Sequence, residues 1–82
     1  ALVKVYPNPA KDQFQIDYMF LNGADVVMEI KNPLGQIVES KTLVPGNGTI
    51  QVNSSKWENG VYFIKLTSGE HHIVKRIVIS QN

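Results

Sequence analysis

Apolar and polar residues alternate along most of this chain, and this alternation restricts the fold more than any other feature. No window of about a dozen residues carries the 3.6-residue period of a helix. The alternation is clearest over residues 13–20, where one side is polar and the other is apolar and mostly aromatic. The apolar side consists of Phe14, Ile16, Tyr18 and Phe20. Because a half-buried antiparallel strand has this pattern, we expect an all-β protein.

Turn signals divide the chain into short segments at spacings near ten residues. Asn-Gly stands at 22–23 and 59–60, Ser-Gly at 68–69, and a flexible Pro-Gly-Asn-Gly connection at 45–48. Asn32-Pro33-Leu34-Gly35 suits a type I turn, with Asn first, Pro second and Gly fourth. The segments on either side of it are therefore predicted to form a hairpin.

Seven strands follow from the alternation and the turns. They are expected at residues 2–6, 13–20, 26–31, 36–42, 49–53, 61–66 and 71–79. Seven short strands without helices predict a seven-stranded antiparallel Greek-key or immunoglobulin-like β-sandwich, and a five-stranded barrel is the lesser alternative. Trp57 is expected at the edge of the core, on a loop over residues 54–58. The predicted core is Phe14, Ile16, Tyr18, Met28, Ile30, Ile50, Val52, Tyr62, Ile64 and Leu66.

The length of 82 residues predicts one domain, residues 1–82, with a thin core. The chain has no cysteine, so neither disulfides nor thiolate metal sites are available to it. Its longest apolar stretches are far shorter than the roughly 18 residues that a membrane span needs, so we expect no membrane insertion. Ala1 does not open a signal peptide, and the chain has the character of a piece of a longer protein.

Candidate chemistry is sparse. His71 and His72 are adjacent on a predicted strand and point to opposite faces, so they cannot share a metal ion. Ser54 and Ser55 have no base and orienting acid assigned to them, and loop-capping roles suit them better. Basic residues are dispersed rather than clustered with aromatics, which argues against nucleic-acid binding. We expect no enzyme activity, no metal and no cofactor.

The last predicted strand contains a conflict with its own pattern. Ile73, Lys75, Ile77 and Ile79 alternate with Val74, Arg76 and Val78, so one basic residue falls on each face. Since burying an unpaired ammonium costs several kcal/mol, Lys75 must lie at a rim, or a bulge must shift the register. Function is expected where a sequence works against its local pattern. We therefore predict an accessible, mildly basic recognition strand made of Lys75, Arg76, Ile77, Val78 and Ile79.

Four segments together resemble a known family. They are VYPNPA at 5–10, NPLGQIV at 32–38, GVYFIKL at 60–66 and the basic, apolar KRIVI at 75–79. In that order and spacing the chain resembles the type A C-terminal sorting domain of type IX secretion (Por secretion) cargo from Bacteroidetes. The family signature comprises Tyr6, Pro7, Asn8, Pro9, Gly35, Gly60, Val61, Tyr62 and Lys65.

The resemblance implies a seven-stranded sandwich and a role in export. A domain of this kind is a C-terminal secretion signal that takes an upstream cargo domain from the periplasm across the outer membrane to the cell surface or medium. The implied partners are type IX translocon components and a sortase-like cysteine peptidase, which removes the domain. The domain would be a substrate of that peptidase and would have no chemistry of its own.

A different function remains open on the same fold. A β-sandwich adhesion or carbohydrate-binding module of a secreted protein could present its loops or Trp57 to a ligand. Position in the parent gene separates the two, because a sorting domain must be the extreme C-terminus of an exported protein. Exposed edge strands also favour strand-mediated self-association.

Overall fold

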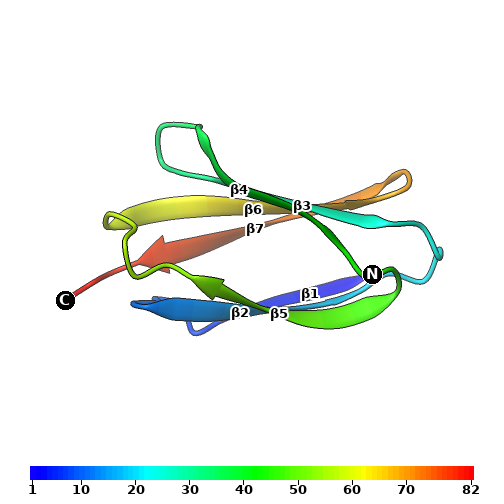
Figure 1. The fold of residues 1–82 in the computed structure, drawn as a ribbon, viewed down its shortest axis with the longest axis horizontal. Helices are drawn as coiled ribbons and strands as arrows, with labels where there is room; N and C mark the ends of the chain where they lie inside the picture. Colours follow the sequence, from blue (N-terminus) through cyan, green and yellow to red (C-terminus); the bar gives the residue numbers. More distant parts are fainter.

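A computed structural model of residues 1–82 contains seven strands and no helix, as expected from the alternation (Figure 1). Accordingly, the structure has no helix that could cross a membrane. The strands are β1 (Leu2–Tyr6), β2 (Gln13–Met19), β3 (Val26–Lys31), β4 (Ile37–Leu43), β5 (Asn47–Asn53), β6 (Gly60–Ser68) and β7 (His71–Ile79).

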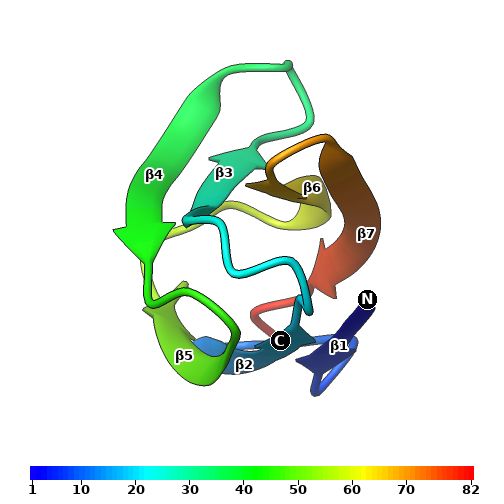
Figure 2. The same ribbon diagram turned by 90° about the vertical axis from the view of Figure 1, so that its right-hand side faces the viewer.

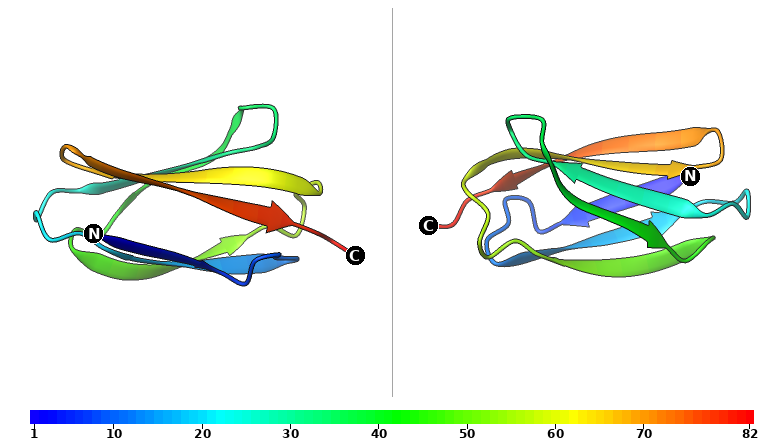
Figure 3. Two further views of the ribbon diagram at one scale, coloured as in Figure 1. Left: turned by 180° about the vertical axis from the view of Figure 1, so that it is seen from behind. Right: turned by 45° about the horizontal axis from the view of Figure 1, so that its top comes forward.

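The strands form two facing sheets, in which all strand pairs are antiparallel (Figures 1 and 3). One sheet has the order β1-β2-β5 and the other the order β4-β3-β6-β7. Strands β3 and β6 are neighbours although two strands separate them along the chain, as in immunoglobulin-like sandwiches. The predicted fold class is confirmed. Figure 2 shows that the edge strands β1 and β7 lie on one side of the sandwich and β4 and β5 on the other.

The core lies between the sheets, where alternate side chains of both layers meet. Nine of the ten residues predicted for it are buried, together with Phe20. Ile50 is only half-buried, because β5 is an edge strand and is covered on one side only. Core residues absent from the predicted list are Val3, Ala10, Phe20, Val26, Leu43, Ile77 and Ile79.

The predicted boundaries differ most at β6, which runs over Gly60–Ser68 instead of 61–66, and at β5, which begins at Asn47 instead of Thr49. Gly48 was expected in a flexible connection, but it lies opposite Tyr18 in the ladder. A Cβ atom at Gly48 would stand only 2.6 Å from Oη of Tyr18, so the missing side chain makes room for the ring. That hydroxyl donates a 2.7 Å hydrogen bond to the carbonyl of Val44. The glycine therefore serves packing in the strand rather than loop flexibility.

The predicted hairpin at Asn32-Pro33-Leu34-Gly35 is present between β3 and β4. The Gly35 amide donates to the Asn32 carbonyl at 2.9 Å, and the Asn32 side chain accepts from the Leu34 and Gln36 amides at 2.9 Å each. Gly35 has a φ of +85°, a conformation that costs glycine little. The pairing register shifts between Ile30 and Lys31, just before the turn.

Candidate functional site

The terminal strand β7 pairs with β6 along its whole length, without a register shift. Ile77 and Ile79 are 0% and 1% exposed and belong to the core. The expectation that both would be accessible is therefore wrong. Side chains of a strand alternate between its two faces, so Ile77 and Ile79 point inward, on the same side of the sheet as Tyr62 and Ile64 of β6. The opposite sheet covers them there. Val74, Arg76 and Val78 point outward and are exposed.

Lys75 lies on the same side of β7 as Ile77, opposite Ile64 in the ladder. It is nevertheless exposed, because β7 is the edge of its sheet and the side chain leaves the core at the rim. Of the two predicted ways to keep this ammonium out of the core, the rim position is correct and the bulge is absent. Strand β7 thus has two accessible cations, Lys75 at the rim and Arg76 on the outer face.

The corner at Tyr6-Pro7-Asn8-Pro9 contacts this terminal strand. The Asn8 side chain accepts from the Val78 amide at 2.9 Å and donates to the Arg76 carbonyl at 3.3 Å. Ala10 continues the contact, since its amide donates to the Val78 carbonyl and its carbonyl accepts from the Ser80 amide, both at 2.8 Å. This short bridge is parallel, between Ala10 and Ile79. The corner therefore caps the outer edge of β7 over residues 76–80.

The sequence did not reveal that the first and last signature segments meet. Asn8 lies 68 residues from Arg76 and 70 from Val78, and nothing local in either segment signals the other. The asparagine side chain is the one sequence feature that suits this contact. An asparagine side chain carries both a donor and an acceptor, so it can pair with an edge strand as a backbone amide does.

The two middle signature segments also touch each other. Gly60, the first residue of β6, has a φ of +152°, and a Cβ atom there would stand 2.7 Å from Cγ of Pro33. This close approach requires glycine at position 60. Gly35 belongs to the same hairpin as Pro33, at the other end of the turn.

Strand β6 divides its signature residues between its two faces. Tyr62 is buried; its hydroxyl donates to the Glu58 carbonyl at 2.7 Å, and its ring stacks on Trp57 at 4.8 Å. Burial is the largest cause that raises the pKa of Tyr62. Val61, Phe63 and Lys65 point outward and are exposed. The inward residues serve the core, whereas the outward ones need another explanation.

The segment after β7 is fixed by contacts that the sequence analysis did not foresee. The Gln81 amide donates to the Asn59 side chain at 2.8 Å, and its side-chain nitrogen donates to the carbonyls of Ser54 and Trp57 at 2.9 and 3.1 Å. Ser54 is itself buried, and its hydroxyl donates to the Lys11 carbonyl at 2.7 Å. The loop-capping role expected for Ser54 is thus confirmed.

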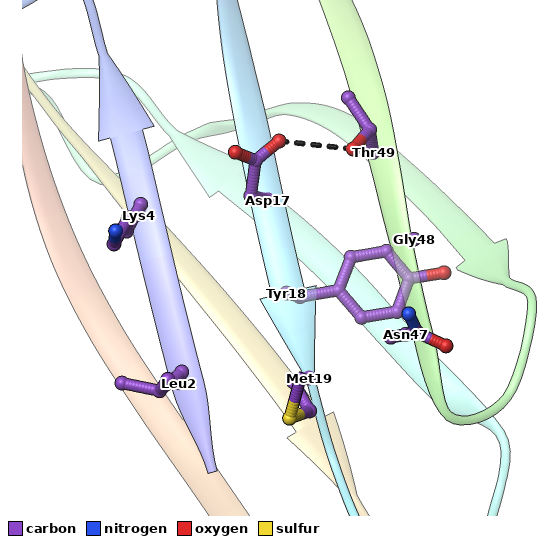
Figure 4. A pocket seen from close by; sticks show the side chains of 8 residues that line it. All are labelled: Leu2, Lys4, Asp17, Tyr18, Met19, Asn47, Gly48 and Thr49. Carbon is purple, nitrogen blue, oxygen red and sulfur yellow. Dashed lines mark hydrogen bonds between the residues drawn. The ribbon is translucent and has the colours of Figure 1, made fainter.

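The outer face of the three-stranded sheet carries a polar network that satisfies itself. The Tyr6 hydroxyl donates to Asp17 at 2.6 Å, and Gln15 donates to the same carboxylate at 2.9 Å. Thr49 also donates to it, at 3.0 Å, as Figure 4 shows. The hydrogen bond with Tyr6 is the main cause that lowers the pKa of Asp17, and it raises the pKa of Tyr6. Lys4 lies on this face as well, beside the shallow hollow drawn in Figure 4.

No group of three or more histidine, cysteine, aspartate or glutamate side chains is placed to hold a metal ion. His71 and His72 stand side by side on β7, opposite Ser68 and Thr67. Trp57 is half-buried, and its ring contacts Phe14 edge-on at 5.8 Å besides stacking on Tyr62.

The four segments that resemble the family touch one another in pairs: residues 5–10 contact residues 75–79, and residues 32–38 contact residues 60–66. These four segments form the candidate functional site.

Comparison with known proteins agrees with this grouping. A search of curated proteins found no match to the chain. The profile of the family described as the secretion system C-terminal sorting domain matches residues 4–80, a range that includes the corner, the hairpin, β6 and the whole of β7. The chain therefore belongs to the family of C-terminal sorting domains of the type IX secretion system, the signals that send secreted cargo across the outer membrane.

Proposed function

We propose that the translocon reads β7 of this sorting domain after the cargo has reached the periplasm. The proposed contact residues are Lys75, Arg76 and Val78, which are all exposed. Ile77 and Ile79 take part by holding the strand against the core. The observation that carries the proposal is that one strand combines both roles: Ile77 and Ile79 anchor it in the core, whereas Lys75 at the rim and Arg76 on the outer face remain exposed.

The capping of β7 by Asn8 supports the proposal. A free sheet edge invites pairing with any other strand, and natural proteins protect such edges. Asn8 and Ala10 occupy the edge over residues 76–80 and leave the side chains of Arg76 and Val78 exposed. Recognition of this stretch would then rest on side chains, which can discriminate between partners, rather than on backbone hydrogen bonds alone.

We infer that a sortase-like cysteine peptidase then removes the domain by cleaving upstream of β1. Leu2, at the start of β1, is 60% exposed, so a linker that precedes it would reach solvent without unfolding the sandwich. Removal of this kind needs no catalytic group in the sorting domain. The adhesion or carbohydrate-binding alternative has less support, because the Trp57 ring, one of the surfaces it would present, stacks on Tyr62 and contacts Phe14 edge-on.

The test uses a periplasmic reporter fused in front of the complete chain and expressed in a type IX secretor. The reporter should reach the cell surface or medium without the domain attached. It should stay in the periplasm when the translocon is deleted, and it should leave the cell uncleaved when the peptidase is inactivated. Export that is independent of the translocon would contradict the proposed function, and cleavage without the peptidase would contradict the proposed removal.

A further inference from the structure

The outer face of the four-stranded sheet brings three cations together around an exposed aromatic ring. The ladder places Phe63 between Lys31 on β3 and Arg76 on β7. In the next row Lys65 stands between Glu29 and Val74. We call the outward residues Lys31, Phe63, Lys65, Val74 and Arg76 the cationic face.

Folding gives little reason for this composition. Phe63 and Val74 are 41% and 53% exposed, and Val61 and Val78, which pair beside them, are 37% and 38% exposed. Side chains on this face line a hollow bounded by Lys31, Phe63, Lys65 and Val74, with Glu29 at its side. An outward sheet face that serves solubility alone would alternate polar residues with the buried ones. A contiguous apolar area rimmed by charges is instead typical of an interaction site.

The opposite outer face of the sandwich provides an internal comparison. There the carboxylate of Asp17 accepts hydrogen bonds from Tyr6, Gln15 and Thr49, so this charged group is paired within the chain. Figure 4 shows the bond from Thr49. No hydrogen bond joins the cations of the cationic face to the rest of the chain in this way. The two faces of one small domain thus differ in what they leave available to a partner.

We propose that the cationic face docks onto an acidic, partly apolar surface of a protein component of the export machinery. This proposal rests on the proposed function and extends it from one strand to three, since Lys31, Phe63 and Lys65 lie outside β7. The charge of this face indicates the kind of partner. The face has three cations and one neighbouring carboxylate, Glu29, so a negatively charged surface would complement it. The exposed ring of Phe63 at its centre provides an apolar anchor.

A protein fits this face better than a membrane does. Binding to anionic lipid surfaces takes clusters of about four to eight basic residues, more than this face carries. A nine-residue strand is about 30 Å long, and neighbouring strands lie about 4.8 Å apart, so the area on offer is near the low end of protein interfaces. Such small interfaces are typical of transient contacts, which suits a signal that must be released after passage.

The first test compares matched charge reversals in the complete chain fused to the periplasmic reporter. Lys31→Glu/Lys65→Glu should lower the exported fraction about tenfold or more, because like charges across an interface cost several kcal/mol. The control Lys11→Glu/Lys56→Glu changes the net charge equally at exposed loop positions and should export normally. Lys31→Arg/Lys65→Arg keeps the charge and should also export. Normal export of the reversed variant, or equal loss in the control, would overturn the proposal.

The second test detects the contact directly, and its main arm keeps all the charges of the face. The photoreactive residue p-benzoylphenylalanine replaces Phe63 in the otherwise unchanged fusion, and irradiated adducts are identified by mass spectrometry. An adduct with a type IX component, weakened by Lys31→Glu but not by Lys11→Glu, supports the proposal. Adducts only with lipid, only with a second copy of the chain, or none at all would overturn it.

The two proposals fail in different ways. If Lys75→Ser/Arg76→Ser blocks export while the reversal at Lys31 and Lys65 has no effect, the cationic face is wrong and recognition of β7 stands. If the unchanged fusion never leaves the cell, the proposed function is wrong, and the adducts formed at position 63 still decide what this face contacts.

Discussion

At the scale of single residues, the side chains of greatest interest are polar groups whose partners lie far along the chain. Asn8 pairs with two backbone groups of β7, and Tyr6 joins Asp17 across the β1–β2 pair. Both belong to the corner segment, so the same short motif supports the two sheets at once. Pro7 between them and Pro9 after Asn8 limit the conformations of the corner, which favours this double contact.

Tyr6→Phe should raise the pKa of Asp17 towards its ordinary value of 3.8, because the main cause of its lowering is the Tyr6 hydrogen bond. A carboxylate whose folded-state pKa is lowered stabilises the fold above its unfolded-state pKa, and this contribution disappears as the pH falls through the folded-state pKa. The stability difference between wild type and variant should thus be full near neutral pH and shrink below pH 3.8. NMR titration of the carboxyl carbon measures the shift, and an unchanged Asp17 pKa would contradict the account.

Asn8→Ala should expose the outer edge of β7. It removes the hydrogen bonds to the Val78 amide and the Arg76 carbonyl, and a net cost of about 1 kcal/mol is expected because water can replace part of them. Hydrogen exchange provides the measurement: the Val78 amide should lose protection, whereas the amides of the central strand β3 should keep theirs. Unchanged protection at Val78 would show that the cap does not act in solution.

At the scale of elements, alternation and turn chemistry predicted the strands well. Leu2–Tyr6, Val26–Lys31 and His71–Ile79 have the expected bounds, because each alternates cleanly between turn signals. The start of β5 was predicted too late because glycine is typical of loops. Only the strand pairing shows that Gly48 lies opposite Tyr18, where a side chain would collide with the ring. Local pattern cannot reveal such pairing between distant segments, which is why the sequence also did not show the contact of Asn8 with β7.

Burial in β7 could be read only in part from the sequence. The alternation placed Lys75 and Ile77 on one side, and the positive charge of Lys75 argued for an accessible strand. In the structure the two residues differ in burial. Ile77 is covered by the opposite sheet, whereas the side chain of Lys75 is exposed at the rim of the core. How far a facing layer covers an edge strand depends on the relative placement of the sheets, which no local pattern records.

Ile77→Ala should destabilise the domain by about 2–5 kcal/mol, the usual cost of truncating a large buried aliphatic side chain. Val78→Thr, a substitution at the exposed neighbour, should cost within about 0.5 kcal/mol. Urea denaturation of both variants measures the difference, and equal stabilities would contradict the register of β7. Deletion of residues 77–82 removes two core residues and therefore tests folding before it tests recognition.

At the scale of the whole molecule, the domain depends on one apolar core between two sheets. It has no cysteine, and no cluster of potential metal ligands is present. The 16 buried apolar residues form a single cluster between the sheets, and their burial is a main contribution to the stability of a domain this small. Single core truncations should have large effects, because a domain of this size has only a few kcal/mol in reserve.

The melting temperature should accordingly be the same with and without a strong chelator such as EDTA, and with and without a reducing agent. The physical reason is that the chain has no cysteine and no group of three or more potential ligand side chains placed to hold a metal ion. Differential scanning calorimetry of the purified chain is the measurement. A large fall in the melting temperature on chelation would reveal a structural ion and contradict the account.

The proposed recognition residues share one strand with core residues, and export of Lys75→Ser/Arg76→Ser separates recognition from folding most directly. Both side chains are exposed, so the variant should fold with a stability within about 0.5 kcal/mol of wild type. The measurement is the fraction of a fused reporter found outside a type IX secretor, with the melting temperature determined in parallel. The account predicts a folded domain whose reporter stays in the periplasm, and normal surface delivery of this variant would contradict it.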